Sequence, residues 1–187
     1  MVTIKKKNAL KILYYMMAMD GIIYDEERSA FDEVGRLVDD RYDSFRADIL
    51  WECQNTALTK GEGDTVFHLL DAAAKEFKDL GNVLTDDCIP GRLLVWNLLV
   101  VALADPNYTD PERRLVDEAV RKLEIEENDF LQMEQVLRAK AAAERELLFL
   151  QQKAAEGTPD LKQQIANVKE RVRIITANAR DIMVQRG

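Results

Sequence analysis

Two groups of acidic residues with the same spacing, 85 positions apart, are the side chains of this sequence best suited to bind a ligand. The first group is Asp20, Asp25 and Glu27, and the second is Asp105, Asp110 and Glu112. Carboxylate oxygens are the ligands that hard divalent cations such as Ca²⁺ and Mg²⁺ prefer. The sequence therefore offers the material for a divalent-cation site at two related turns.

The acidic groups belong to a longer internal repeat. Residues 20–33 and 105–118 align without a gap, and six of the 14 positions are identical, whereas about one match is expected by chance. The identical pairs are Asp20/Asp105, Asp25/Asp110, Glu27/Glu112, Arg28/Arg113, Asp32/Asp117 and Glu33/Glu118. Because an apolar helical segment precedes each copy, we expect a pseudo-twofold pair of helix-turn-helix halves.

The spacing of these acids differs from that of the EF-hand calcium loop. An EF-hand closes with a bidentate Glu at its twelfth position. Counted from Asp20 and from Asp105, the twelfth residues are Phe31 and Val116. The sequence therefore excludes the EF-hand and leaves a cation site of another design open.

Helix capping is the structural alternative for part of the acidic pattern. Asp25 and Asp110 are suited to be N-caps, and Pro111 fits the first helical position. Glu27 and Glu112 would stabilise the positive end of each helix dipole. Capping thus accounts for four of the six acids without a metal ion.

Capping does not account for Asp20 and Asp105. Each lies at the C-terminal end of a predicted helix, where the helix dipole disfavours a carboxylate. An unfavourable charge that occurs twice suggests a positive charge beside it. We expect either a bound cation or the side chain of Arg28 or Arg113.

The composition limits the classes of partner. The chain has 187 residues, with 26 Lys or Arg and 34 Asp or Glu, so its net charge is −8. Binding to nucleic acid is not expected because it needs a clustered cationic surface, and a charged partner would be a cation. The two cysteines, Cys53 and Cys88, form no disulfide framework, which favours a cytoplasmic location. No apolar run reaches the roughly 20 residues of a membrane span, so the chain is not expected to be membrane-embedded.

The sequence contains few residues arranged as a known catalytic motif requires. A di-iron bundle needs two Glu-x-x-His elements, and the only histidine, His68, lacks the preceding Glu. Gly61 and Gly63 are not followed by the Lys and Ser or Thr of a phosphate-binding loop. We therefore expect a protein without enzymatic activity.

Apolar residues recur at intervals of three and four almost everywhere, and nowhere at a sustained interval of two. This periodicity predicts an all-α fold without strands. We expect helices near residues 4–19, 26–38, 43–58, 64–80, 89–104, 111–123, 127–155 and 159–186. Trp51, Phe67 and Trp96 are expected in the core of the bundle.

Beyond residue 126 the acidic turn does not recur, and the predicted helices are long and polar. In the last helix, apolar residues at intervals of four and three form a coiled-coil seam: Leu161, Ile165, Val168, Val172, Ile175, Ala179 and Ile182. The preceding helix carries an alanine-rich stripe, which predicts an antiparallel helical hairpin, with dimerisation as the competing interpretation. We divide the chain into a helical domain, residues 1–135, and a C-terminal hairpin, residues 136–187.

The segment Ala18-Met19-Asp20-Gly21, with Asp25, Glu27 and Arg28 after it, and its echo from Ala104 to Arg113 resemble the signature segments of the TerB-type tellurite-resistance family. That family also includes the N-terminal domain of membrane-anchored DnaJ-like co-chaperones, and the similarity covers roughly residues 5–135. It implies an all-helical domain that binds divalent metal through acidic clusters and acts in tellurite or general stress response, without established enzymatic activity. The metal ligands it implies are Asp20, Asp25, Glu27, Asp105, Asp110 and Glu112, with Asp32 and Asp117 as secondary candidates. Pro106 departs from the pattern, because the first copy has Gly21 there.

Two functional hypotheses follow. In the first, the protein is a TerB-like stress-response protein whose acidic turns bind a divalent cation, calcium being one candidate. In the second, it is a metal-independent adaptor whose carboxylates cap helices and whose C-terminal helices bind a protein partner or a second copy of the chain.

Overall fold

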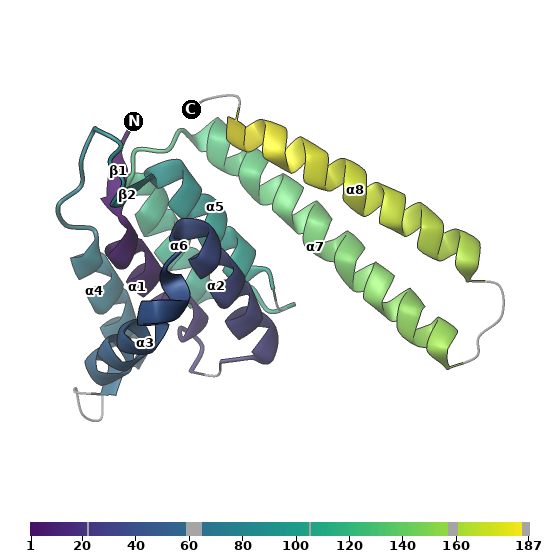
Figure 1. The fold of residues 1–187 in the computed structure, drawn as a ribbon, viewed down its shortest axis with the longest axis horizontal. Helices are drawn as coiled ribbons and strands as arrows, with labels where there is room; N and C mark the ends of the chain where they lie inside the picture. Colours follow the sequence, from purple (N-terminus) through teal and green to yellow (C-terminus); the bar gives the residue numbers. More distant parts are fainter. Residues whose placement is uncertain (22, 59–64, 105, 157–160, 185–187) are drawn as a thin grey trace. The chain divides into compact units, whose positions relative to one another are not determined.

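The computed structural model describes residues 1–21, 23–58, 65–104, 106–156 and 161–184 (Figure 1). Within these ranges it contains eight α-helices and one pair of short β-strands. The chain forms two compact units, residues 1–126 and residues 127–187. The all-α architecture predicted from the periodicity is confirmed. None of the described helices is both long enough and apolar enough to cross a membrane.

The first unit is built around α1. Its elements are β1 (Thr3–Lys5), α1 (Lys6–Met17), α2 (Asp25–Val38), α3 (Tyr42–Leu58), α4 (Thr65–Glu76), β2 (Cys88–Pro90), α5 (Gly91–Ala102) and α6 (Asp110–Lys122). α1 packs against α2, α3, α4 and α5, and nine of its 12 residues are buried. α5 is also largely buried and packs against α1, α2 and α6. These two helices form the core because they are apolar on nearly every side.

The prediction that the chain contains no strand is wrong at two places. β1 and β2 pair antiparallel, with Ile4 opposite Ile89 at the centre of the pair. Each strand is three residues long. A segment of that length is too short to show the alternation of apolar and polar residues that identifies a strand in sequence.

The two strands extend the internal repeat beyond its acidic turns. A shift of 85 positions places β1 on β2, α1 on α5, and α2 on α6 apart from its last residue. The connecting hydrogen bonds obey the same symmetry: the Lys6 N–H donates to the Asp87 carbonyl at 2.9 Å, and the Gly91 N–H donates to the Val2 carbonyl at 2.8 Å. The repeating unit is therefore a strand and two helices, and the pseudo-twofold axis passes between Ile4 and Ile89.

The expectation that Trp51 and Phe67 belong to the core is wrong. Trp51 is 68% exposed and Phe67 is 64% exposed, whereas Trp96 is half-buried. On α3 the buried side is set by Ile49 and Cys53, four residues apart. Trp51 follows Ile49 by two positions, a rotation of about 200° around the helix, so it points to solvent.

A close approach of α2 and α3 closes the core of the first repeat. Gly35 lies directly against the buried ring of Tyr42, and a Cβ atom at position 35 would be 2.5 Å from that ring. Tyr42 also makes an edge-to-face contact with Phe31, with ring centroids 6.0 Å apart. The missing side chain of Gly35 thus makes room for the aromatic cluster.

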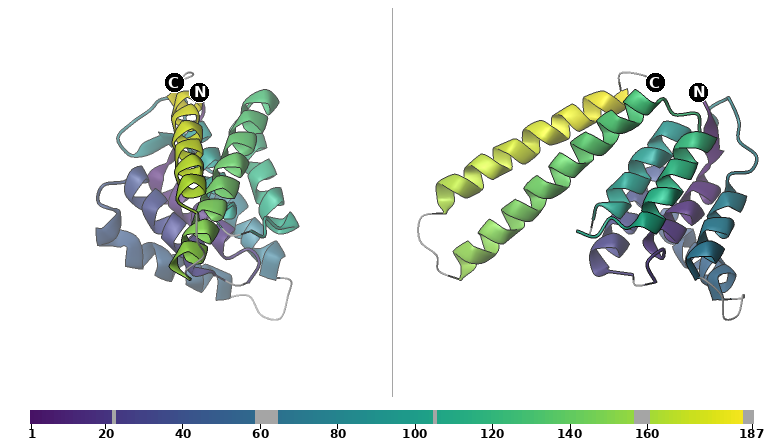
Figure 2. Two further views of the ribbon diagram at one scale, coloured as in Figure 1. Left: turned by 90° about the vertical axis from the view of Figure 1, so that its right-hand side faces the viewer. Right: turned by 180° about the vertical axis from the view of Figure 1, so that it is seen from behind.

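The second unit is the predicted helical hairpin. It consists of α7 (Glu127–Ala155) and α8 (Lys162–Val184), which pack against each other (Figure 2). The seam buries Ala143 and Leu150 of α7 against Val168 and Ala179 of α8. The apolar seam is therefore closed within one chain, as the antiparallel interpretation predicts. The expected domain boundary at residue 135 falls inside α7, and the turn at 157–160 lies outside the described residues.

Candidate functional site

Glu27 of the first acidic turn caps its own helix. It is the third residue of α2 and only 3% exposed. The N–H of Tyr24, the N-cap residue, donates to Glu27 Oε2 at 3.0 Å. A backbone donor at the start of α2 that would otherwise need water is thereby satisfied.

Glu112 of the second turn makes the equivalent contact. It is also 3% exposed, and its Oε2 accepts from the Thr109 N–H at 2.6 Å and from Thr109 Oγ1 at 2.7 Å. The Glu112 N–H donates back to Thr109 Oγ1 at 3.5 Å, which completes a capping box. Tyr24 and Thr109 have nearly the same backbone conformation, with φ near −78° in both. Both copies of the repeat thus use the Glu at the third position of the helix as an intramolecular cap.

Asp25 and Asp110 are not the N-caps that we predicted. They are the first residues of α2 and α6, one position after the caps, and both are exposed. Pro111 is correspondingly the second helical residue. The cap lies one residue earlier because the inward-turned Glu fixes where the helix begins. At their actual positions the two Asp carboxylates still interact favourably with the positive end of the helix dipole.

The structure describes only one of the two acids that capping leaves unexplained. Asp20 is exposed, just after the end of α1, and is followed by Gly21 with a φ of +83°. Asp105 lies outside the described residues. Among the residues that are described, no three His, Cys, Asp or Glu side chains come together to hold a metal ion. The residues implied as ligands therefore do not assemble a metal site within that part of the chain.

Asp32, a secondary metal candidate, is instead bound by side chains of α3. Arg46 donates to both of its oxygens, Nε to Oδ1 at 2.6 Å and a terminal nitrogen to Oδ2 at 2.9 Å. The Tyr42 hydroxyl donates to Oδ1 at 2.7 Å. Burial acts to raise the pKa of Asp32, but the hydrogen bonds from Arg46 and Tyr42 outweigh it and lower the pKa. Asp32 thus ties α2 to α3, whereas its counterpart Asp117 is exposed.

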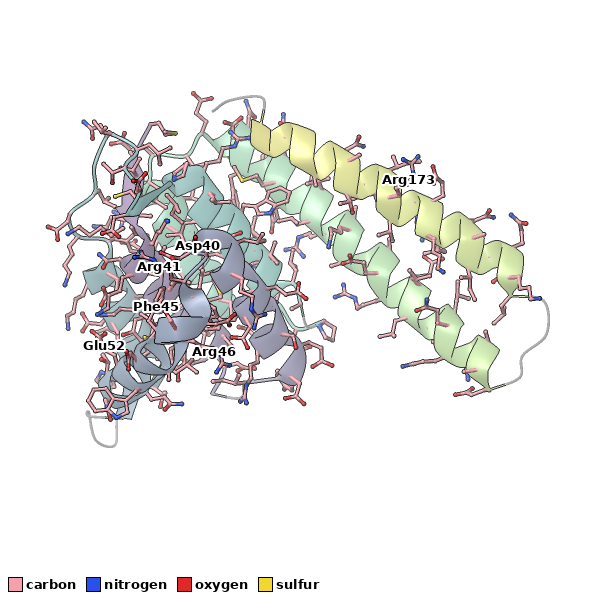
Figure 3. The ribbon with its side chains drawn as sticks, in the orientation of Figure 1. Asp40, Arg41, Phe45, Arg46, Glu52 and Arg173 are labelled. Atoms are coloured by element: carbon pink, nitrogen blue, oxygen red, sulfur yellow. The ribbon has the colours of Figure 1, made fainter. Side chains whose placement is uncertain are left out.

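A second carboxylate is fixed at the corner between α2 and α3, where Figure 3 labels Asp40 and Arg41. Asp39 is buried, and its Oδ1 accepts from the Arg41 N–H at 2.9 Å and from Arg41 Nε at 3.3 Å. These hydrogen bonds lower the pKa of Asp39 to about 2. Sequence spacing could not reveal either fixed carboxylate, because their partners depend on how α2 turns into α3.

The buried thiol of the first unit is not suited to nucleophilic catalysis. Cys53 is fully buried, and burial raises its pKa to about 12. The thiolate is the reactive form, so a thiol with so high a pKa is inert near neutral pH.

Nearby, Lys11 Nζ lies 2.5 Å from Glu52 Oε1 and 3.6 Å from Glu76 Oε1. This polar group joins α1, α3 and α4 through ion pairs.

One face of the hairpin keeps large apolar side chains in solvent. An ion pair between Glu146 of α7 and Arg171 of α8 marks this face. Phe149 and Ile174 each follow a member of that pair by three residues, so both point to the same side of the hairpin. Phe149 is 57% exposed and Ile174 is 48% exposed. We call these four residues the Phe149 face.

Two further side chains of α7 lie on the same side of the helix as Phe149. Leu131 is exposed and precedes Phe149 by 18 residues, which is five complete helical turns, so it lies in line with it. The Lys153 ammonium group is 5.9 Å from the centre of the Phe149 ring. Leu131 is thus about 27 Å from Phe149 along the helix axis, and Arg138 and Arg145 lie between them on the same side of α7.

Comparison with known proteins found no matching family model, no matching curated protein and no matching solved structure. The resemblance to the TerB-type family therefore depends on the residues of the repeat alone. The geometry of the two units is the remaining guide to function.

Proposed function

We propose that this protein is a non-enzymatic adaptor that binds an amphipathic helix of a partner protein on the Phe149 face. One observation carries the proposal: the hairpin closes its own seam, yet Phe149 and Ile174 remain about half exposed on one side. Side chains needed only for the hairpin would be buried in its seam. Large apolar groups that stay in solvent cost solubility and are typical of interaction sites.

A helix is the partner structure that fits two packed helices best. Helices laid side by side leave a groove between them, and an amphipathic helix fills such a groove with apolar residues at intervals of three and four. Phe149 on one wall and Ile174 on the other would be the central anchors, since aromatic residues dominate interface energies. Glu146 and Arg171 would supply polar contacts.

The charge of the chain favours a different protein as the occupant over a second copy. Residues 1–126 contain 16 basic and 25 acidic side chains, a net charge of −9, whereas residues 127–187 carry a net charge of +1. Two copies of the chain each carry a net charge of −8, and like charges oppose their association. A partner without this negative charge meets no such opposition.

Photo-cross-linking tests the proposal and identifies the partner. A photoreactive phenylalanine analogue at position 149 should cross-link to a segment of another protein that is amphipathic with helical periodicity. The matched control places the analogue at Leu37, which is exposed on α2 of the first unit, and should not capture that segment. Cross-links at position 149 only to a second copy of this chain, or to the same segments as position 37, would contradict the proposal.

The resemblance of the repeat to the TerB-type family supports a cytoplasmic role in tellurite or general stress response for this adaptor. This part of the proposal is tested separately. Expression of the chain in a tellurite-sensitive bacterium should improve survival, and a variant with Phe149 and Ile174 replaced by alanine should not. Equal survival with both proteins would separate the stress role from the Phe149 face.

A second candidate function is divalent-cation binding at the repeated turns. The observation that favours it is that Asp20 and Asp25 are exposed on either side of one turn, on a unit whose net charge is −9. The ligands would come from these residues and their counterparts Asp105 and Asp110, because Glu27 and Glu112 are used as caps. Calorimetric titration of chelator-stripped protein with Ca²⁺ should show saturable binding that Asp20→Asn abolishes, whereas no binding at millimolar Ca²⁺ would eliminate this candidate.

A further inference from the structure

The hairpin has a second exposed face, on the other side of its seam from the Phe149 face. Leu148 follows Glu146 by two residues on α7, and Lys169 precedes Arg171 by two residues on α8. Because the helices run antiparallel, these two steps cover the same distance along the hairpin, and each turns by about 200° around its helix. Leu148 and Lys169 therefore lie level with each other, on the side away from the Glu146–Arg171 ion pair.

Four more exposed residues continue this face toward the tip of the hairpin, where α7 and α8 run side by side (Figure 2). Gln151 and Ala155 follow Leu148 by three and seven positions on α7, and residues at these intervals share one side of a helix. On α8, Ala166 is one turn from both Lys169 and Lys162. We call these six residues the Lys169 face.

The two lysines of this face have no carboxylate partner among the residues that the structure describes. From residue 134 onward, every carboxylate whose side chain is described is instead bound by another cation of the hairpin. These ion pairs are Glu134–Arg138, Glu144–Lys140, Glu146–Arg171, Glu156–Lys153 and Glu170–Arg173, the last with the arginine that Figure 3 labels on α8. A carboxylate for Lys162 and Lys169 would therefore come from another molecule.

The charge of the two units favours the hairpin as the place where an acidic segment binds. Residues 127–187 carry a net charge of +1, whereas residues 1–126 carry −9 and repel a negative segment. An apolar contact is also available on the Lys169 face, because Leu148 is 56% exposed. Single exposed leucines are common on protein surfaces, but this one lies level with a lysine that lacks a partner.

The spacing of the two lysines fits an acidic helix. Lys162 and Lys169 are seven residues apart, about 10.5 Å along the axis of α8. Two glutamates seven residues apart on another helix have the same spacing, and an apolar residue one turn from either would reach Leu148. A nucleic acid or an anionic membrane fits less well, because two lysines neutralise few phosphates and one leucine inserts little apolar surface.

We infer that the Lys169 face binds an acidic amphipathic helix of a partner protein. The carboxylates of that helix contact Lys162 and Lys169, and its apolar residue packs on Leu148. The small side chains of Ala155 and Ala166 let its backbone come close, since the distance between packed helices depends on the side chains at the contact. This binding does not depend on the Phe149 face.

Fluorescence anisotropy with a synthetic helix tests the inference. The probe is a labelled amphipathic peptide of about 20 residues, long enough to form a helix, with two glutamates seven positions apart and a leucine one turn from both. The matched probe has glutamine in place of both glutamates. At low salt the glutamate probe should bind the full chain saturably and the glutamine probe about tenfold more weakly, because an exposed ion pair contributes up to about fivefold in affinity. No binding of the glutamate probe at about 1 mM protein, or equal binding of the two probes, would overturn the inference.

A pair of variants locates the binding. Lys169→Gln should weaken binding of the glutamate probe about threefold, because it removes one of the two charges that face the probe. Lys78→Gln is the matched control, since Lys78 is another exposed lysine with no carboxylate partner among the described residues and belongs to the first unit. Equal affinity of the two variants, or binding of phosphatidylserine vesicles or RNA that Lys169→Gln weakens while the probe does not bind, would overturn the inference. Thermal melts should show both variants as stable as the wild type, because neither lysine contacts a described carboxylate.

Discussion

Replacing Glu112 with alanine removes the acceptor that closes the N-terminus of α6. The Thr109 N–H and hydroxyl groups, which donate to Glu112 at 2.6 Å and 2.7 Å, would lose their partner in a buried setting. Loss of a capping interaction costs about 0.5 to 2 kcal/mol, and a buried donor left unpaired costs about 1 to 3 kcal/mol. Because the hydroxyl can rotate to another acceptor, we expect a loss of about 2 kcal/mol.

Thermal unfolding followed by circular dichroism measures this loss. For a chain of this length, about 2 kcal/mol lowers the Tm by about 4 to 8 °C. Asp110→Ala is the matched control, because Asp110 is exposed in the same helical turn and contributes at most about 1 kcal/mol through the helix dipole. The loss should be the same in chelator and in millimolar Ca²⁺, since the cap needs no metal. A Glu112→Ala protein as stable as the wild type, or a loss that appears only with Ca²⁺, would refute the capping argument.

Three further perturbations test how the first repeat is held together. Gly35→Ala should lower the free energy of unfolding, measured in urea, by about 2 kcal/mol. The steric overlap of the added Cβ atom with Tyr42 outweighs the gain of up to about 1 kcal/mol in helix propensity. A variant more stable than the wild type would contradict this packing. Arg46→Ala should lower the free energy of unfolding by about 1 to 3 kcal/mol in the same assay, because Asp32 loses both hydrogen bonds from Arg46 and keeps the one from Tyr42. An unchanged unfolding midpoint would show that the Arg46–Asp32 contact contributes nothing to stability. Because the pKa of Asp39 is lowered to about 2, its contribution is complete above pH 4 and is lost as the pH falls toward 2. Arg41, the partner of Asp39, is exposed, so we reduce the expected contribution to about 1 kcal/mol. The free energy of unfolding should therefore fall by about 1 kcal/mol less between pH 4 and pH 2 in Asp39→Asn than in the wild type, and an identical fall in both proteins would contradict this.

Most of the helical architecture could be predicted from the sequence because apolar periodicity is a local signal. The eight helices and the intramolecular pairing of α7 with α8 follow from intervals of three and four. The repeat was also visible, but only over its acidic turns. Its full extent, including β1 and β2, depends on pairing between segments 85 positions apart, which no local pattern shows.

The candidate sites were harder to predict because the same residue type can serve two roles. The spacing of Glu27 and Glu112 suited both a cap and a metal ligand, and only the inward turn of their side chains favours the cap. Trp51 was expected in the core by residue type, but the position of Ile49 on α3 turns it to solvent. The Phe149 face could not be found from one helix, because it requires the register between α7 and α8 in which Glu146 pairs with Arg171.

The most direct test of the adaptor proposal is the affinity of the cross-linked partner helix, made as a fluorescent peptide, for three forms of the full chain. The Phe149→Ala/Ile174→Ala double variant should bind at least about 30-fold more weakly than the wild type, a loss of about 2 kcal/mol. Leu37→Ala should bind as the wild type does and keep its stability to within about 0.5 kcal/mol, because Leu37 is 81% exposed. The double variant should lose up to about 3 kcal/mol, because Phe149 and Ile174 are each about half-buried, so circular dichroism must show it folded under the assay conditions. Unchanged affinity of the double variant would contradict the assignment of partner binding to the Phe149 face.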